Sequence, residues 1–264
     1  MKLTICSSTY NNNETLDLFI DSLILQSYKD WELQICNDED NHNKLKKFDN
    51  YTKDERIKVE QNNENIGLTN SLIKLIEKLP KDAYIVRMDD DELHSSEYLI
   101  SIANLFKLGH DLIIFTEHPI LGNIIKKFHS RKPQIASLIL CLTGNIAKHG
   151  GISFTKKCYL NSNGYSKDFK LSQDYNLLIK LLKVSKNPYI TSKLNFKPFD
   201  IERTSHKISK DRKTMQKIFA LNSIIGIFDE SSINDNITFY KFIILLIISI
   251  PFKITRSIIS RFFK

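Results

Sequence analysis

The stretch Ala83-Tyr84-Ile85-Val86-Arg87-Met88-Asp89-Asp90-Asp91-Glu92 is a short apolar run that ends in four consecutive acids. The apolar part predicts a buried strand over 83–88. Adjacent carboxylates repel one another, and a divalent cation would relieve that repulsion, although an ordinary solvated loop after a strand is the alternative. Oxygen-only ligands suit Mg²⁺ or Mn²⁺, which bridge carboxylates to substrate phosphates. A nucleotide diphosphate is therefore the expected ligand.

Short apolar runs alternate with helix-period patterns on both sides of this stretch. Further strands are expected at 3–7, 31–36, 57–59 and 112–115, and helices at 13–24, 68–79, 98–106 and 174–184. Strands separated by helices predict an α/β fold with a doubly wound, mostly parallel sheet flanked by helices. Residues 126–151 are weakly patterned and fit a long loop, a pair of short helices, or both.

Composition excludes several classes of protein. The 264 residues, 42% hydrophobic and 26% charged, suit one large α/β domain with a small appendage, and they exclude wholesale disorder and a polytopic membrane protein. Four cysteines without CxxC spacing argue against a zinc cluster and read as reduced thiols of a cytosolic protein. The first residues lack the apolar segment of a secretory signal, so we expect no export.

The positive charge is concentrated in a C-terminal tail, residues 237–264. Five of the eight excess charges lie after Asp235, where there are no acids, so only +3 remains on the rest of the chain. Residues 242–250 are almost wholly apolar but well short of the roughly 20 residues that span a bilayer. Beyond Pro251, bases and serines share one helical face, and isoleucines and phenylalanines the other.

The tail therefore predicts an amphipathic helix at an anionic membrane surface, and no nucleic-acid partner. Packing of the tail on the rest of the chain, or in a homodimer contact, is the alternative. We expect a domain over 1–236, divided near residue 118 into a nucleotide half and an acceptor half, followed by the membrane-associating tail.

Polar residues follow three of the predicted strands, at Thr9-Tyr10-Asn11, 37–40 and 89–92. Because ligands bind at the carboxyl ends of strands in open α/β sheets, we expect these clusters to line one cleft. Tyr10 is a candidate to stack on a nucleobase and Asp38 to accept hydrogen bonds from it. Core packing of Tyr10 and a turn or helix cap at Asp38 are the alternatives. The chain has neither GxxxxGK[ST] nor GxGxxG, so other phosphate-binding loops are unsupported.

Taken together, these clusters resemble the family 2 glycosyltransferases of GT-A fold from bacterial polysaccharide and lipopolysaccharide assembly. Residues 8–11 are similar to that family's P-T-Y-N start, and 22–33 to its S-L-x-x-Q-T-Y-x-x-x-E-[IL] stretch. Residues 65–72 resemble N-x-G-L-x-x-[SA]-x, 87–92 the R-M-D-x-D-D form of the DxD motif, and 163–165 with 173–177 the G-G-[YF]…E-D-Y-D-L pair. The motifs occur in order over 3–182, which is more specific than a DxD motif alone.

The resemblance implies a role for each matching residue. Thr9, Tyr10 and Asp38, with Asp89 and Asp90, would bind the nucleotide of a sugar donor, by resemblance a UDP-sugar. Asp91 and Asp89 would hold Mn²⁺ or Mg²⁺, with His206 as a further candidate ligand. Asp174 would be the general base, although a carboxylate in a first helical turn is also favoured by the helix dipole alone. His149 is expected to be structural.

The implied activity is metal-dependent, inverting transfer of a hexosyl or N-acetylhexosaminyl group to a glycan or lipid-linked oligosaccharide. The resemblance and the tail together place this reaction at the inner face of the bacterial cell membrane. Gln173 stands where the family has Glu, and Asn176 where it has Asp. A catalytically impaired carbohydrate- or membrane-binding relative is therefore one alternative, and a nucleic-acid-binding protein is another.

Overall fold

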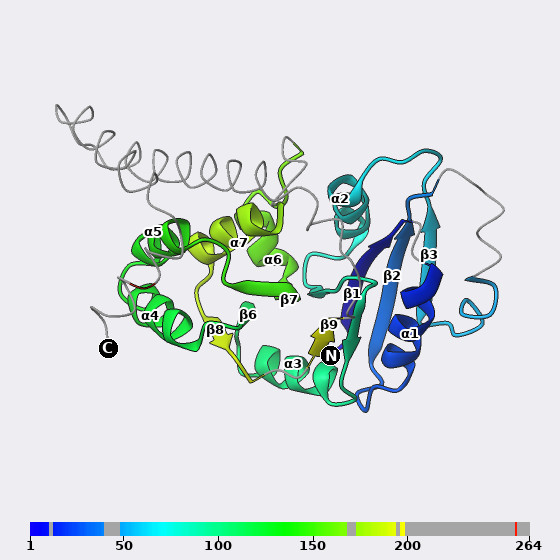
Figure 1. Ribbon diagram of the computed structural model, residues 1–264, viewed down its shortest axis with the longest axis horizontal. Helices are drawn as coiled ribbons and strands as arrows, with labels where there is room; N and C mark the ends of the chain where they lie inside the picture. The colour runs from blue at the N-terminus through cyan, green and yellow to red at the C-terminus, as the bar shows by residue number, and fades with distance from the viewer. Residues whose placement is uncertain (11–12, 40–47, 168–172, 194–195, 199–256, 258–264) are drawn as a thin grey trace.

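The computed structural model describes residues 1–10, 13–39, 48–167, 173–193, 196–198 and 257 (Figure 1). His206 and all of the predicted tail except Ser257 lie outside the described residues. The elements are β1 (Leu3–Thr9), α1 (Asn13–Ile24), β2 (Trp31–Asn37), β3 (Ile57–Gln61), α2 (Leu68–Lys78), β4 (Tyr84–Arg87), β5 (Glu92–His94), α3 (Tyr98–Lys107), β6 (Leu112–Thr116), α4 (Pro119–His129), α5 (Pro133–Thr143), β7 (Ala147–Thr155), α6 (Lys156–Asn161), α7 (Gln173–Val184), β8 (Pro188–Thr191) and β9 (Phe196–Pro198).

The main sheet has seven strands in the order β3-β2-β1-β4-β7-β6-β8. Neighbouring strands pair in parallel except at β7, which runs antiparallel to both β4 and β6. A second, two-stranded sheet pairs β5 with β9. The predicted α/β fold with a mostly parallel sheet is confirmed.

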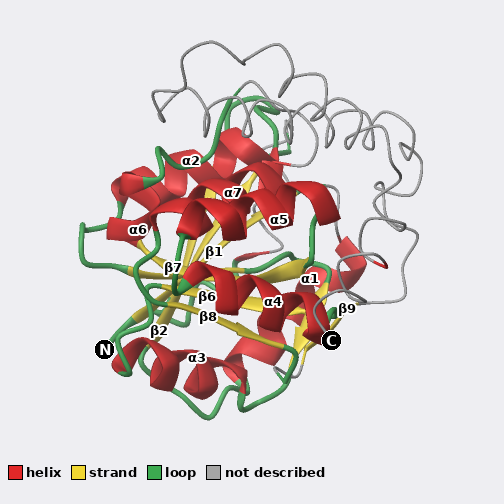
Figure 2. Ribbon diagram, turned by 90° about the vertical axis from the view of Figure 1, so that its left-hand side faces the viewer, coloured by secondary structure: helices red, strands yellow, loops and turns green. Residues whose placement is uncertain are grey.

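Helices cover both faces of the sheet, as Figure 2 shows for α2, α5, α6 and α7 on one side and α3 on the other. Successive strand residues point to opposite faces, so Ile5 packs in the core beneath α1 and α3, and Cys6 in the core beneath α2 and α4–α7. Ile85 and Val86 divide in the same way. Burial on both faces explains why the strands read as continuous apolar runs.

The weakly patterned region 126–151 contains the last turn of α4, all of α5 and the start of β7. Each helix has a proline in its first turn, where the missing N–H costs no hydrogen bond. Of the outcomes left open by the sequence, the pair of helices is the one formed. The antiparallel strand β7 was not predicted. The direction of a strand depends on the neighbouring strands with which it pairs and not on the residue pattern within it.

The sequence leads us to expect reduced cysteine thiols and a chain without membrane-spanning helices. All four cysteines are buried and free. Within the described ranges, no helix combines the length and the apolar character needed to cross a bilayer.

A buried amide ties the end of α1 to the segment that follows β5. The Gln26 side chain donates from Nε2 to the Ser95 carbonyl at 2.7 Å and to the Ser22 carbonyl at 3.0 Å. Its Oε1 accepts from the Leu99 N–H, in the first turn of α3, at 3.0 Å. Gln26 thereby anchors the chain just beyond the acids at 89–92, which gives the glutamine of the 22–33 motif a structural role.

Replacing Gln26 by Leu should lower the free energy of unfolding by about 1–3 kcal/mol, because the buried Leu99 N–H loses its acceptor. Urea unfolding followed by circular dichroism measures the change. Leu25→Gln is the matched control, since Leu25 is 71% exposed, and it should shift stability by less than about 0.5 kcal/mol. Equal losses in the two variants would contradict this role for Gln26.

Candidate functional site

The polar clusters that follow β1, β2 and β4 emerge at one edge of the sheet. β1 lies between β2 and β4, and all three strands run in parallel. Their carboxyl ends, at Thr9, Asn37 and Arg87, are therefore neighbours. Arg87 is in register, through Cys6, with Gln34, three residues before Asn37, so two strand spacings of about 4.8 Å and this offset put Arg87 and Asn37 roughly 14 Å apart.

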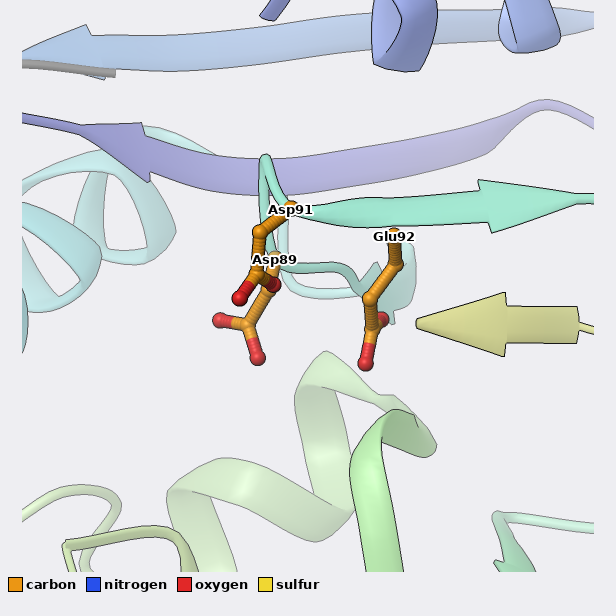
Figure 3. A group of neighbouring side chains, drawn as sticks. All are labelled: Asp89, Asp91 and Glu92. Atoms are coloured by element: carbon orange, nitrogen blue, oxygen red, sulfur yellow. The ribbon is translucent and has the colours of Figure 1, made fainter. Parts of the chain in front are cut away.

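Three carboxylates gather just after β4. One oxygen from each of Asp89, Asp91 and Glu92 lies within 4.8 Å of the others. Figure 3 shows all three side chains extending to the same side of the chain. Glu92 is fully buried, and the other two are partly buried. An all-carboxylate set of hard oxygen ligands is what Mg²⁺ and Mn²⁺ prefer, so these residues fit a divalent cation.

Sequence reasoning assigned Asp91 and Asp89 to the metal but not Glu92. The signal available for Glu92 was its place in the run of four acids. Asp90, predicted to contact the nucleotide, lies in the turn between β4 and β5 and is partly buried.

Arg87, the last residue of β4, connects the acids to Asp174. The side chain is 3% exposed, and its Nη2 lies 2.7 Å from Asp89 Oδ1 and 3.5 Å from Asp174 Oδ1. Burial alone would lower the pKa of Arg87, but the carboxylates of Asp174 and Asp89 outweigh it and raise the pKa well above its ordinary value. Asp174, in the first turn of α7, is thus brought to the acidic site by a permanent cation.

Asp38 is buried and has a structural role, the ordering of the loop before α2. It is 2% exposed, and its Oδ1 accepts from Asn62 Nδ2 at 2.7 Å and from the Ile66 N–H at 2.9 Å. Its Oδ2 accepts from the N–H of Gly67, the N-cap of α2, at 2.8 Å. A carboxylate offers about four acceptor positions, so these three bonds leave room for one more. Contact with a nucleobase stays a prediction.

Thr9 and Tyr10 end β1 in different environments. Thr9 is buried, and its carbonyl accepts from the Asp38 N–H at 2.9 Å, which joins the ends of β1 and β2. Tyr10 is 52% exposed, so the core-packing alternative does not apply to it. An exposed ring at this edge suits stacking on a planar ligand, and that role stays a prediction. The side chain of His149, in β7, lies outside the described part.

His94 is buried beside Glu92. Its Nε2 lies 3.8 Å from Glu92 Oε2, and its ring packs on Tyr98 with centroids 4.6 Å apart. Burial lowers the pKa of His94 to about 3, so the imidazole is neutral at physiological pH. His94 therefore adds no positive charge to the acidic group.

Gly150, in β7, makes room for the Glu92 carboxylate. Its φ is 64°, a left-handed conformation that favours glycine. A Cβ at this position would lie 1.7 Å from Glu92 Oε2. Any larger residue would therefore displace Glu92 from the acidic group.

Gly150→Ala should lower the free energy of unfolding and also reduce the thermal stabilisation produced by added Mn²⁺, because Glu92 must move. Gly109→Ala is the matched control, since Gly109 has a φ of 84° but nothing within 4 Å of its would-be Cβ. Its free energy of unfolding should fall by about 1–2 kcal/mol because of the left-handed conformation alone. Its thermal stabilisation by Mn²⁺ should be unchanged. An undiminished Mn²⁺ response in Gly150→Ala would contradict the link between this glycine and the acidic group.

Solved structures share the fold. The structure of residues 1–349 of TarS from S. aureus in complex with UDP-GlcNAc superimposes with a TM-score of 0.60 at 13% identity, over 93% of this chain and 70% of that one. The mannosyltransferase PcManGT from Pyrobaculum calidifontis, in complex with GDP-Man and Mn²⁺, superimposes with a TM-score of 0.61 at 13% identity, over 84% of this chain and 64% of that one. The GT-A-like fold is therefore confirmed.

Sequence relatives agree with the motifs. A putative glycosyltransferase of Bacillus subtilis, EpsE, is 25% identical over 227 residues, which is 82% of this chain and 76% of that protein. The O-antigen biosynthesis glycosyltransferase WbnJ of Escherichia coli is 26% identical over 188 residues, 68% of this chain and 71% of that protein. The model of glycosyl transferase family 2 matches residues 4–160, more than half of the 264 residues, and the chain belongs to this family.

Proposed function

We propose that this glycosyltransferase moves a sugar from a UDP-sugar to a hydroxyl of a glycan or lipid-linked glycan, with inversion at the anomeric carbon. The observation that carries the proposal is the juxtaposition, through Arg87, of Asp174 with the acidic group after β4. A base for the acceptor and a cation site for the donor diphosphate then lie in one place. The UDP-GlcNAc complex of TarS supports the choice of UDP, and the O-antigen role in the name of WbnJ supports a polysaccharide acceptor.

The donor would lie along the edge formed by β2, β1 and β4. The exposed Tyr10 ring would stack on the base, the remaining acceptor position of Asp38 would take a base N–H, and Thr9 would line the floor. The diphosphate would then reach Asp89 and Asp91. A divalent cation held there and by Glu92 would supply positive charge against the charge that develops on the departing diphosphate. The Mn²⁺ complex of PcManGT supports Mn²⁺ or Mg²⁺ in this role.

Asp174 would act on the acceptor. A sugar hydroxyl is a weak nucleophile, so a positioned carboxylate that takes its proton speeds the attack. The hydroxyl oxygen forms a bond to the anomeric carbon while the bond from that carbon to the diphosphate oxygen breaks. The electron pair leaves on the diphosphate, and the proton ends on Asp174. Attack from the face opposite the diphosphate inverts the configuration.

We further propose that the enzyme works at the inner face of the bacterial cell membrane, held by the tail at 237–264. The support is the basic, amphipathic composition of that tail. Residues 1–236, with a donor half before about 118 and an acceptor half after it, would form the catalytic domain. His206 as a metal ligand and a homodimer both remain proposals that rest on sequence alone.

A panel of UDP-GlcNAc, UDP-glucose, UDP-galactose and GDP-mannose, each with and without Mn²⁺, tests the donor by thermal unfolding. One UDP-sugar should raise Tm by roughly 5–10 °C at about 100 times its Kd, and only with Mn²⁺. Asp91→Ala should abolish the shift, because the acidic group loses a ligand. Glu97→Ala, at a nearby exposed acid, should keep it. A shift that survives without metal would contradict metal-dependent donor binding.

Replacing Asp174 by Asn should lower the rate of donor hydrolysis, with water as the acceptor, by about 10²–10⁴-fold, since the amide cannot take the proton. Calorimetry should find the affinity for UDP with Mn²⁺ unchanged. Gln173→Glu, at the neighbouring position, is the control and should stay active. A wild type that binds donor without turning it over would instead identify the impaired, binding relative.

A further inference from the structure

We infer that Arg87 is a positioning residue of the transfer reaction. Its guanidinium holds the Asp174 carboxylate at a fixed position beside the acidic group formed by Asp89, Asp91 and Glu92. This inference rests on the proposed function. Arg87 would not contact the reacting atoms. It would act through Asp174, and its ion pair with Asp89 would fix the guanidinium beside the acidic group.

One nitrogen of Arg87 serves both carboxylates. Because Nη2 lies 2.7 Å from Asp89 Oδ1 and 3.5 Å from Asp174 Oδ1, those two oxygens can be no more than about 6 Å apart. Two carboxylates at such a separation repel each other when no cation lies between them. The guanidinium therefore sets how close Asp174, on α7, comes to the acids that follow β4.

The sheet holds Arg87 more firmly than it holds either carboxylate. Arg87 is in register with Cys6 of β1 on one side and with Ile152 of β7 on the other. Asp174 instead lies on α7, outside the sheet, and the next residue, Tyr175, anchors that helix by donating its hydroxyl to the Leu140 carbonyl at 3.0 Å. Arg87 is thus a fixed cation against which a helix-borne carboxylate is aligned.

Burial of the Arg87 side chain carries a free-energy cost. Buried ion pairs are often no more stabilising than apolar residues of similar size. The Nε and Nη1 atoms of Arg87 are also buried without a hydrogen-bond partner among the described residues, and buried donors that lack partners cost free energy. Because loss of Arg87 alone would leave Asp89 and Asp174 without their shared cation, the guanidinium is what holds these two carboxylates together.

The test measures hydrolysis of the UDP-sugar that the thermal-unfolding panel identifies as the donor, and it compares Arg87→Met and Arg87→Lys with wild type. Arg87→Met should lower kcat about 10²-fold, the typical cost of a small misplacement of a catalytic group, while KM for the donor changes less than about threefold. Arg87→Lys should recover at least about tenfold in kcat, because it restores the charge. Arg131→Met, at an exposed arginine, is the matched control and should leave both constants unchanged.

A double variant separates positioning from a merely structural role. If Arg87 acts through Asp174, then Arg87→Met combined with Asp174→Asn should hydrolyse the donor no more slowly than Asp174→Asn alone. Losses that multiply in the double variant, or equal activity losses in the Met and Lys variants, would overturn the inference. So would wild-type kcat in Arg87→Met.

Two further outcomes complete the test. If Arg87→Met does not fold, Arg87→Lys is compared with wild type, and the double variant, which also removes the charge of Asp174, is compared with Asp174→Asn. An active wild type with unaffected Arg87 variants would overturn this inference alone. A wild type with neither hydrolysis nor Mn²⁺-dependent stabilisation would overturn the proposed function, and the role of Arg87 with it.

Discussion

Repulsion between carboxylates is the constraint on which the arrangement of this site depends. Asp89, Asp91 and Glu92 offer oxygens within 4.8 Å of one another, and Asp174 comes close to the same group. Positive charge nearby relieves the repulsion between these carboxylates. The buried guanidinium of Arg87 supplies part of it from inside the sheet, and the oxygen ligands suit a divalent cation that would supply the rest.

The sheet provides a rigid support for these charges. Helices cover both of its faces, so β1, β2 and β4 are buried, and their carboxyl ends lie at the same edge of the sheet. The reversed strand β7 adds Gly150, whose missing side chain leaves the space that Glu92 occupies. Rigid strands thus place the residues proposed to bind the donor, while α7, a separate helix, carries the proposed base. Such a division lets acceptor handling change without rebuilding the donor site.

Two residues of the family-like motifs have structural roles, and one of them, Asp38, is also proposed to bind the donor. Asp38 orders the loop before α2 with three hydrogen bonds and still has room for another. Gln26, in a motif shared with the family, organises the chain beyond the acids. Gln26 illustrates that a motif residue can stabilise the fold through its own hydrogen bonds.

Local pattern determined much of this protein. Apolar periodicity predicted the strands and helices up to 115, apart from β5, and the helix near 174–184, and the ordered motifs predicted the family. Other features required the tertiary structure: the direction of β7, the space that Gly150 leaves for Glu92, and the contact of Arg87 with Asp174. Periodicity reports which face of a segment is buried, because that depends on spacing within the segment. Strand direction and ion pairing depend on which distant segments meet, and only the packed chain decides that.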